Sequence, residues 1–289
     1  MSSQKILVLG ATGYIGSATV KTLASLKAKV TAGVRDTSKA KELQNSGAQV
    51  IKADMSQNQN ELAKTLSNYN SVYLVTPGHI DRTQITINAI QAAKQANVQY
   101  LLVVSVPCAD NQDVLFGRQF TPIEKELKNS GLKYGILRLP LFTDNVWGNN
   151  EPIRTHNTFY GPINGDKKFV TVAIQDAALA AATILLNPSK HIGKTYTITS
   201  DYQSSYEQAQ TFSQALGRQI KYINATFEGT KQALLKLMPE WQVDGCLELY
   251  KLIEKNDISQ VNHTNDFKLI TGSQPTTNLS WMWQNFKAF

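Results

Sequence analysis

The sequence predicts an α/β fold: a Rossmann-type, doubly wound parallel sheet with a smaller, mostly helical C-terminal lobe. Short β-rich apolar runs alternate with helical segments through the first half of the chain, and this alternation is typical of a parallel sheet with helices on both faces. A glycine-rich turn, GATGYIG at 10–16, stands between the first apolar run and the first helical segment. After Pro140 the alternation ends, and Asn, Gly and Pro become frequent.

The elements of the first half follow from these patterns in order. Six apolar runs are expected to form strands: 5–10, 29–34, 49–52, 71–76, 99–105 and 133–140. The clearest helix between them is 80–96, in which Ile87, Ile90 and Ala93 follow the helical period. Residues 141–168 are rich in turn-forming residues, so we expect loops that reach over the ligand-binding edge of the sheet.

The second half is predicted less regularly. Asp176 is expected to open an alanine-rich helix that ends at Asn187-Pro188, and 193–200 is expected to form another strand. Residues 205–257 are expected to be mostly helical. A packed terminal helix is expected to carry three aromatic residues: Trp281, Trp283 and Phe286.

These elements divide the chain into two parts. Residues 1–150 are assigned to an NAD(P)-binding Rossmann domain, to which the segment 169–200 returns. Residues 151–289 are assigned to a smaller lobe for a substrate or a partner. The oligomeric state is left open by the sequence.

Composition excludes several classes of protein. The 289 residues carry a net charge of +7, with 42% hydrophobic and 18% charged residues, as in a globular protein with a lysine-rich surface or an anionic partner. No basic stripe is interleaved with aromatic residues, so direct nucleic-acid binding is not expected. No apolar run approaches the roughly 18 residues of a membrane span. Cys108 and Cys246 form neither a disulfide framework nor a metal motif, and the four histidines are scattered, so we expect a cytoplasmic protein without a metal.

The glycine-rich turn predicts a dinucleotide site. Gly10 permits a tight turn, Gly13 lets the backbone approach a pyrophosphate, and Gly16 lets the helix pack against the strand. The N–H groups at the start of the following helix favour an anion. The remaining residues of this turn that are predicted to contact the cofactor are Thr12, Tyr14 and Ile15.

The end of the second strand indicates which dinucleotide binds. An acidic residue there would bind the ribose 2′-hydroxyl of NAD, whereas an arginine pairs with the 2′-phosphate of NADP. Arg35 stands at this position and Lys39 follows, which favours NADP(H). The neighbouring Asp36 leaves NAD(H) open as the less favoured cofactor. Further predicted cofactor contacts follow later strands: Asp54 and Met55 near the adenine, then Thr76, Pro77, Gly78, Ser105, Pro140 and Phe142 along the cofactor.

Several segments resemble the NmrA-like family of atypical short-chain dehydrogenases. They are GATGYIG with VRD, NSGLKYGILRLPLFTDN (129–145), KFVTVAIQDAALAAATILLNP (168–188) with HIGKTYTITS, and LITGSQPTTNLSWMWQNF (269–286). The resemblance covers the whole chain in order. It implies a Rossmann fold with a small C-terminal lobe and a preference for NADP(H). Members of the family include quinone reductases, redox-sensing regulators that bind the cofactor without turning it over, and proteins of unknown role.

No obvious proton donor is predicted. Ordinary short-chain reductases use a tyrosine whose pKa is lowered by a lysine four residues later, but Phe120 and Glu124 stand at that spacing. Some relatives have a histidine at the position of Phe120 and a glutamate at that of Glu124. Thr121-Pro122-Ile123-Glu124 also has the pattern of a capping box at a helix start. The weaker candidates for a catalytic role are Ser105, Tyr160 and His79.

Hydride transfer without a protein acid suits an acceptor whose reduced form is a stable anion, such as a quinone. The protein then mainly positions the nicotinamide against the acceptor in a dry pocket. Four aromatic residues are candidates for the pocket wall or for ordinary packing: Phe142, Trp147, Phe159 and Tyr160. Two hypotheses remain: an NADPH-dependent oxidoreductase with a small-molecule acceptor, and a non-catalytic redox sensor that acts through a protein partner.

Overall fold

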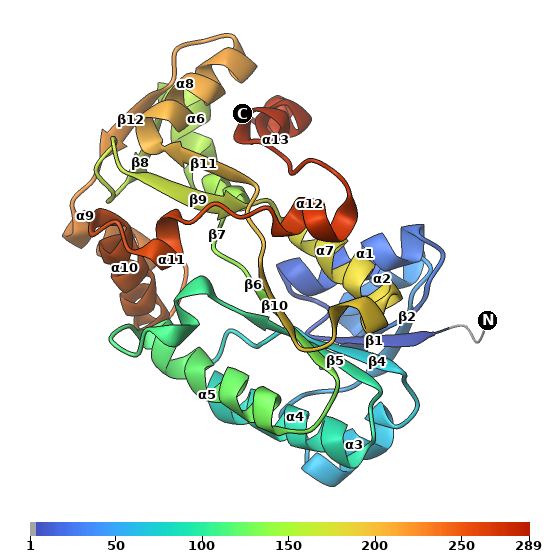
Figure 1. Cartoon of the computed structure of the whole chain (residues 1–289). Coiled ribbons are helices and arrows are strands. Elements are labelled where there is room, and N and C mark those ends of the chain that lie inside the picture. Colours follow the sequence, from blue (N-terminus) through green and yellow to red (C-terminus); the bar gives the residue numbers. More distant parts are fainter. Residues whose placement is uncertain (1–3) are drawn as a thin grey trace.

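A parallel sheet forms the centre of the protein, in the computed structural model that describes residues 4–289 (Figure 1). The seven strands lie in the order β10-β6-β5-β4-β1-β2-β3, and all of their pairings are parallel. Their bounds are β1 Lys5–Leu9, β2 Lys29–Val34, β3 Gln49–Lys52, β4 Ser71–Leu74, β5 Tyr100–Ser105, β6 Tyr134–Arg138 and β10 Lys194–Thr197. The strand order reverses between β1 and β4, where ligands bind in such sheets.

Helices cover both faces of this sheet. Alternate residues of β1 point to opposite sides, so Ile6 and Val8 pack in one buried cluster while Leu7 and Leu9 pack in another. The first cluster is covered by α1 (Tyr14–Ser25), α2 (Lys41–Asn45) and α7 (Ile174–Leu186). The second cluster is covered by α3 (Gln59–Leu66), α4 (Arg82–Gln95) and α5 (Leu115–Asn129). Sheet strands buried on both faces explain the almost continuous apolar runs in the sequence.

The second lobe combines helices with two small sheets. One sheet has the order β11-β9-β7 and the other pairs β12 with β8. The strands are β7 Leu141–Phe142, β8 Thr158–Gly161, β9 Lys168–Val172, β11 Asp201–Ser204 and β12 Lys221–Asn224. The helices are α6 Asn150–His156, α8 Ser205–Leu216, α9 Phe227–Leu234, α10 Glu240–Glu254, α11 Ile258–Val261, α12 Asp266–Thr271 and α13 Asn278–Asn285. Short 3₁₀ turns complete the chain at Thr37–Ala40, Pro107–Asp110, Thr143–Asn149, Pro188–His191 and Phe286–Ala288.

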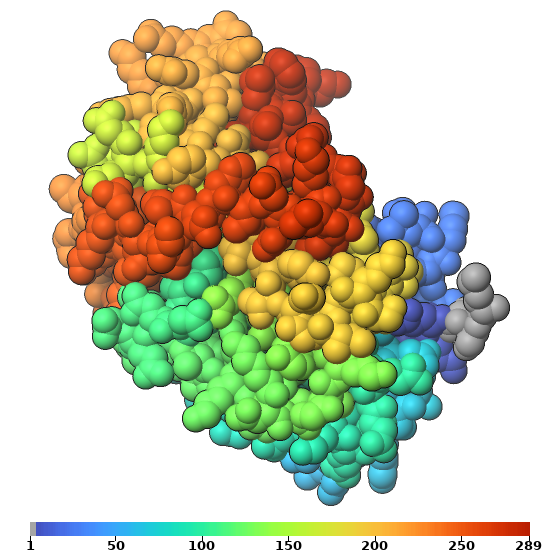
Figure 2. Space-filling model, viewed as in Figure 1, coloured from blue at the N-terminus to red at the C-terminus, as the bar shows by residue number. Residues whose placement is uncertain are grey.

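The two parts of the chain are tied together by segments that cross between them. The chain leaves the second lobe through α7, which packs beside α1, and through β10, which adds the outer strand beside β6. The segment of α11 and α12 then runs across the front of the molecule (Figure 2). There the Asp266 carboxylate accepts a hydrogen bond from the Thr197 backbone at 2.8 Å. The part of the molecule built on the seven-stranded sheet therefore combines elements from the first half of the chain with α7 and β10 from later in the sequence.

The predicted fold class is confirmed, but three local predictions are wrong. Residues 141–168 do not form loops throughout, because they contain a 3₁₀ turn, α6 and β8. The capping box at Thr121–Glu124 does not exist, since α5 begins at Leu115 and encloses Pro122. Of the three aromatic residues predicted to pack in a terminal helix, only Trp281 is buried, whereas Trp283 is 52% exposed and Phe286, which lies in the 3₁₀ turn after α13, is 48% exposed.

Residues 4–289 contain neither a helix suited to a membrane nor a cluster of metal ligands. None of the helices found there has both the length and the apolar character to cross a bilayer. In the same part of the chain, no three side chains of His, Cys, Asp or Glu gather as metal ligands would.

Candidate cofactor site

The glycine turn between β1 and α1 is tight because two of its positions leave no room for a side chain. Gly10 has φ +75°, and a Cβ there would lie 2.7 Å from the carbonyl oxygen of Val75. A Cβ on Gly16 would lie 2.3 Å from the carbonyl oxygen of Gly10. A Cβ on Gly13 would meet only that same oxygen, at 3.5 Å. Gly10 and Gly16 thus serve the fold, and Gly13 keeps the outer side of the turn free for a ligand.

The N-terminus of α1 has the features of an anion site. Gly13 is the N-cap residue, no side chain caps the helix, and no acidic residue lies in its first turn. The first N–H groups of a helix have no partners within the helix and carry partial positive charge. Thr12 and Tyr14 are exposed beside them, whereas Ile15 is buried against the sheet. This arrangement fits the pyrophosphate of a dinucleotide.

Positive charge gathers at the end of β2. Arg35 and Lys39 are both exposed there. Asp36 accepts hydrogen bonds from the Ser38 hydroxyl at 2.7 Å and the Ser38 backbone at 3.0 Å. These bonds, with a smaller effect of the charges on Lys39 and Lys52, lower the pKa of the Asp36 carboxyl. Asp36 therefore caps its own turn, and Lys52, which the sequence analysis did not select, adds to the cationic surface.

The other predicted cofactor contacts lie in the loops that follow the strands. Asp54 caps a turn by accepting the Ser56 N–H at 3.0 Å, and Met55 is buried beneath it. Pro77 is partly buried after β4, and its carbonyl accepts a hydrogen bond from Arg82 Nε at 2.8 Å. Around these contacts, Thr76 and Phe142 are partly buried, Gly78 is exposed and Pro140 is buried.

Glu124, at the position of the lysine in ordinary reductases, is the centre of a buried ionic network. Arg138 donates from Nε to Oε1 and from Nη2 to Oε2, both at 2.8 Å, and Lys128 donates to Oε2 at 3.0 Å. The Ser105 hydroxyl donates to Oε1 at 2.7 Å. Burial by itself would raise the pKa of the Glu124 carboxyl, but the bonds from Arg138 and Ser105 outweigh it and lower the pKa.

This network bears on the hypotheses for Glu124 and Ser105. Glu124 is an ionised structural partner of Arg138, and Asp110 binds the other side of the same guanidinium at 2.8 Å. Ser105 is fully buried, and its proton is engaged by Glu124. A serine held in this way is a poor proton donor for a substrate. These contacts instead join the ends of β5 and β6 to α5 at the carboxyl edge of the sheet.

The remaining catalytic candidates lie apart. Phe120, on α5, is 2% exposed and packs in the buried cluster that α3, α4 and α5 cover. His79 is exposed, and its Nδ1 accepts the Asp81 N–H at 3.1 Å. Tyr160 lies on β8 in the second lobe and is 45% exposed. The structure does not assemble these side chains into one group.

Two members of the predicted aromatic wall serve as packing. Phe159 is buried against Phe212 and Tyr222 in the second lobe. Trp147 stacks on Phe289, with ring centroids 4.8 Å apart, and also contacts Trp281. These contacts support the packing interpretation for Phe159, whereas Trp147 is packed on one side and 41% exposed.

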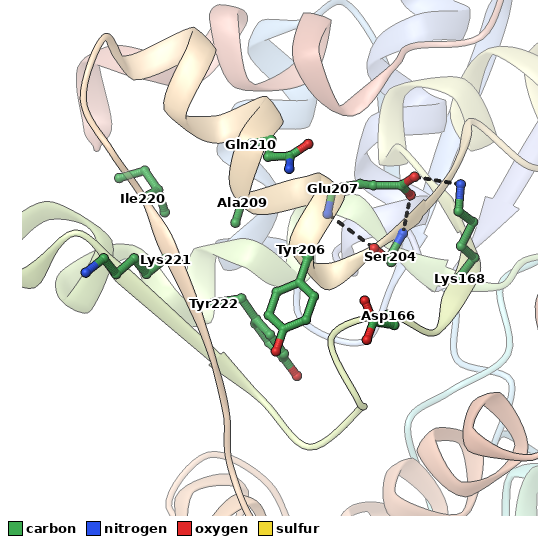
Figure 3. A pocket seen from close by; sticks show the side chains of 10 residues that line it. All are labelled: Asp166, Lys168, Ser204, Tyr206, Glu207, Ala209, Gln210, Ile220, Lys221 and Tyr222. Atoms are coloured by element: carbon green, nitrogen blue, oxygen red, sulfur yellow. Dashed lines mark hydrogen bonds and ion pairs between the residues drawn. The ribbon is translucent and has the colours of Figure 1, made fainter.

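A shallow hollow of about 650 Å³ lies in the second lobe, away from the glycine turn. Its polar side chains are paired with one another: Lys168 with Glu207 at 2.6 Å, and Ser204 with Glu207 in a capping box (Figure 3). The ring of Tyr206 fills the space over Gly165. The hollow is therefore open and partly filled by paired side chains, and it has no feature that fits a dinucleotide, so the glycine turn remains the candidate site.

The parallel sheet, its strand reversal and the glycine turn define the class: a Rossmann-type protein with the features of a dinucleotide-binding fold. Residues 2–279 match the NmrA-like family. The chain belongs to the NmrA-like family, as its sequence segments predicted.

Three relatives illustrate the similarity. The chain is 32% identical to the NAD(P)H azoreductase of Xenophilus azovorans, over 90% of this chain and 91% of that protein. It is 28% identical to quinone oxidoreductase 2 of Escherichia coli (strain K12), over 76% of this chain and 77% of that protein. The solved structure of Citrobacter sp. triphenylmethane reductase complexed with NADP(H) superposes with a TM-score of 0.83 at 23% identity, covering 99% of this chain and all (100%) of the other.

Proposed function

We propose that this protein is an NADP(H)-dependent oxidoreductase that transfers a hydride to a quinone-like or other conjugated acceptor. The observation that carries the proposal is the open turn at Gly13, with an uncapped helix behind it and Arg35 beside it. The turn fits a pyrophosphate, and the cations at the end of β2 fit a 2′-phosphate. The engagement of Asp36 with Ser38 supports NADP(H) over NAD(H).

The reactions that the site can catalyse are limited by the lack of a proton donor among Phe120 and Ser105. Phe120 has no proton to give, and the Ser105 hydroxyl is held by Glu124. A simple carbonyl would need a protein acid for its alkoxide. A quinone does not, because hydride brings two electrons and leaves a delocalised hydroquinone anion, which takes its proton from water. When bound, NADPH supplies the hydride, while the protein positions the acceptor and excludes water.

The names of the relatives agree with such acceptors. Azo compounds, quinones and triphenylmethane dyes are all conjugated molecules, and the three relatives are named for reducing them. We extend only this shared property to the present chain. The particular acceptor is a question for assay.

The test follows NADPH absorbance with a panel of quinones, an azo dye and a triphenylmethane dye. Turnover well above the rate without protein is expected for at least one of them. The Gly13→Val variant is the matched control, because a Cβ there makes only an ordinary contact with the fold, at 3.5 Å from the Gly10 carbonyl oxygen, and the valine is expected to block the outer side of the turn. Failure of the wild type to bind either NADPH or NADH, measured by calorimetry, would refute the proposal.

A second candidate function is a redox sensor that binds NADP(H) without turnover and acts through a protein partner. The missing proton donor favours it equally, because a sensor needs no acid. Tight NADPH binding without turnover of any acceptor would support this candidate. Sensing also requires different affinities for two states of the protein, so NADPH and NADP should then differ in their effect on partner association.

A further inference from the structure

The first residue of α4, Arg82, is a buried cation surrounded by aromatic rings. The side chain belongs to a residue that is only 8% exposed. Its guanidinium carbon lies 5.0 Å from the centre of the Phe120 ring, 5.4 Å from that of Phe116 and 5.9 Å from that of Trp241. These rings come from α5 and α10, so Arg82 lies where three helices meet.

Arg82 has no anionic partner within residues 4–289. Its hydrogen bond runs from Nε to the Pro77 carbonyl, and no ion pair to a carboxylate is found in the described chain. Burial lowers the pKa of the guanidinium to about 10, which still leaves it protonated at neutral pH. A buried charge is normally paired. Aromatic faces offset part of the burial, but both terminal Nη groups are left to donate elsewhere.

The place of Arg82 connects it with the candidate cofactor site. Pro77 belongs to the loop after β4, at the edge where the strand order reverses. Phe120, over which the guanidinium lies, occupies the position of the proton donor in ordinary reductases. α10 lies against α5 beside it (Figure 1), where Gly245 has no side chain and a Cβ would meet Leu115 and Phe116. The Arg82 guanidinium therefore lies beside Phe120, at the position where ordinary reductases carry their proton donor.

We propose that Arg82 binds the oxygen of the conjugated acceptor that becomes negative as hydride arrives. The acceptor is a planar aromatic molecule with such an oxygen, as in a quinone, and its ring is held by Phe116 and Trp241. Hydride adds two electrons to the acceptor and NADPH becomes NADP⁺. The resulting oxyanion accepts hydrogen bonds from the Nη groups until water protonates it. A fixed donor aimed at developing charge is a strong source of catalysis. This inference rests on the proposed function.

The experiment measures anion preference without turnover. Calorimetry compares para-nitrophenolate, a stable mimic of the reduced acceptor, with neutral para-nitroanisole, both at mildly alkaline pH and with NADP⁺ present. The wild type should prefer the phenolate. Arg82→Met should lose this preference by on the order of 10- to 100-fold, as for a hydrogen bond to a charged group, while the anisole affinity stays unchanged. Arg82→Lys should restore part of it.

Arg118→Met is the matched control. Arg118 is an exposed guanidinium on α5 that pairs with Glu248 at 3.7 Å, so its loss should leave both affinities as they are. A wild type without phenolate preference, or a folded Arg82→Met variant that keeps it, overturns the inference. The wild-type comparison decides the matter even where Arg82→Met fails to fold, which its thermal melting curve reveals.

Steady-state kinetics separates this inference from the proposed function. If the wild type reduces quinones, Arg82→Met should lower kcat by a similar factor and leave NADPH affinity unchanged. Equal kcat in the two proteins overturns the role of Arg82 and leaves the reductase intact. A wild type that binds NADPH and prefers the phenolate but reduces no acceptor refutes the reductase proposal, while the anion site stands.

Discussion

Replacing Glu124 by Gln would remove one negative charge from the buried network and keep the shape of the side chain. The Glu124 side chain is 4% exposed, and its partner Arg138 is 14% exposed. The carboxylate accepts from Arg138, Lys128 and Ser105. Breaking a buried pair by removing one partner costs about 3–5 kcal/mol. We expect the free energy of unfolding to fall by about 3 kcal/mol, because Asp110 still neutralises part of the Arg138 charge.

Asp110→Asn provides the matched comparison, since it makes the same chemical change at the other carboxylate on Arg138. The Asp110 side chain is 76% exposed, and an exposed ion pair contributes about 0–1 kcal/mol. Urea unfolding of both variants and of Arg138→Met gives the free energies, and the double variant of Glu124 and Arg138 gives their coupling. Similar losses for Glu124→Gln and Asp110→Asn would refute the assignment of Glu124 as the buried centre.

The same network predicts a dependence on pH. The pKa of Glu124 in the folded protein lies below its ordinary value of 4.5. Its contribution to stability is therefore fully present above that value and is lost as pH falls through the lower folded pKa. The difference in unfolding free energy between the wild type and Glu124→Gln should shrink as the pH is lowered into this range. A difference that stays constant with pH would contradict an ionised Glu124.

Three further substitutions test the cofactor site and its neighbour. Gly13→Val should weaken NADPH binding by at least about tenfold in a folded protein, as calorimetry would show. Gly16→Val should instead lower the free energy of unfolding by at least ~2 kcal/mol, because its Cβ would lie 2.3 Å from a backbone oxygen. Thermal melting distinguishes this loss of stability from a loss of binding. Arg35→Asp should weaken NADPH binding far more than NADH binding, and equal losses would remove the case for a 2′-phosphate site. Phe120→Ala should lower the unfolding free energy by about 3–5 kcal/mol without changing NADPH affinity, and a selective loss of that affinity would contradict its role in packing.

The sequence was most informative where one local pattern determines the structure. GATGYIG predicted a tight turn, and Gly10 and Gly16 are the residues at which a side chain would collide with backbone oxygens. Strand–helix alternation predicted the parallel sheet because each strand is buried on both faces. These features depend on neighbours in the chain or on hydrophobicity alone, so the sequence displays them.

The predicted capping box was wrong because tertiary packing, and not the local sequence pattern, determines where α5 begins. Thr121 and Pro122 have the pattern of a helix start, yet the helix begins earlier, at Leu115. Inside the helix, the Thr121 hydroxyl donates to the Gly117 carbonyl at 2.8 Å and also to that of Ala109. Pro122 is accommodated within α5 because the amphipathic face of the whole helix packs against the sheet and α4.

The side-chain network of the site lay beyond local patterns. Ser105, Glu124 and Arg138 come from β5, α5 and β6, so only the finished fold brings them together. Arg82 gave no signal either, because no motif surrounds it and its aromatic partners come from α5 and α10. A buried arginine without an acid can be recognised only when every neighbour is known.

The position of β10 has a consequence for how the protein is made. This strand completes the sheet beside β6, although α6, β8, β9 and α7 come between them in the chain. A ribosome that has just released β6 has delivered six of the seven strands, and β6 still presents an unpaired edge. Such an edge invites association with other nascent chains. We therefore expect the nascent chain to associate most readily before β10 emerges and pairs with this side of β6.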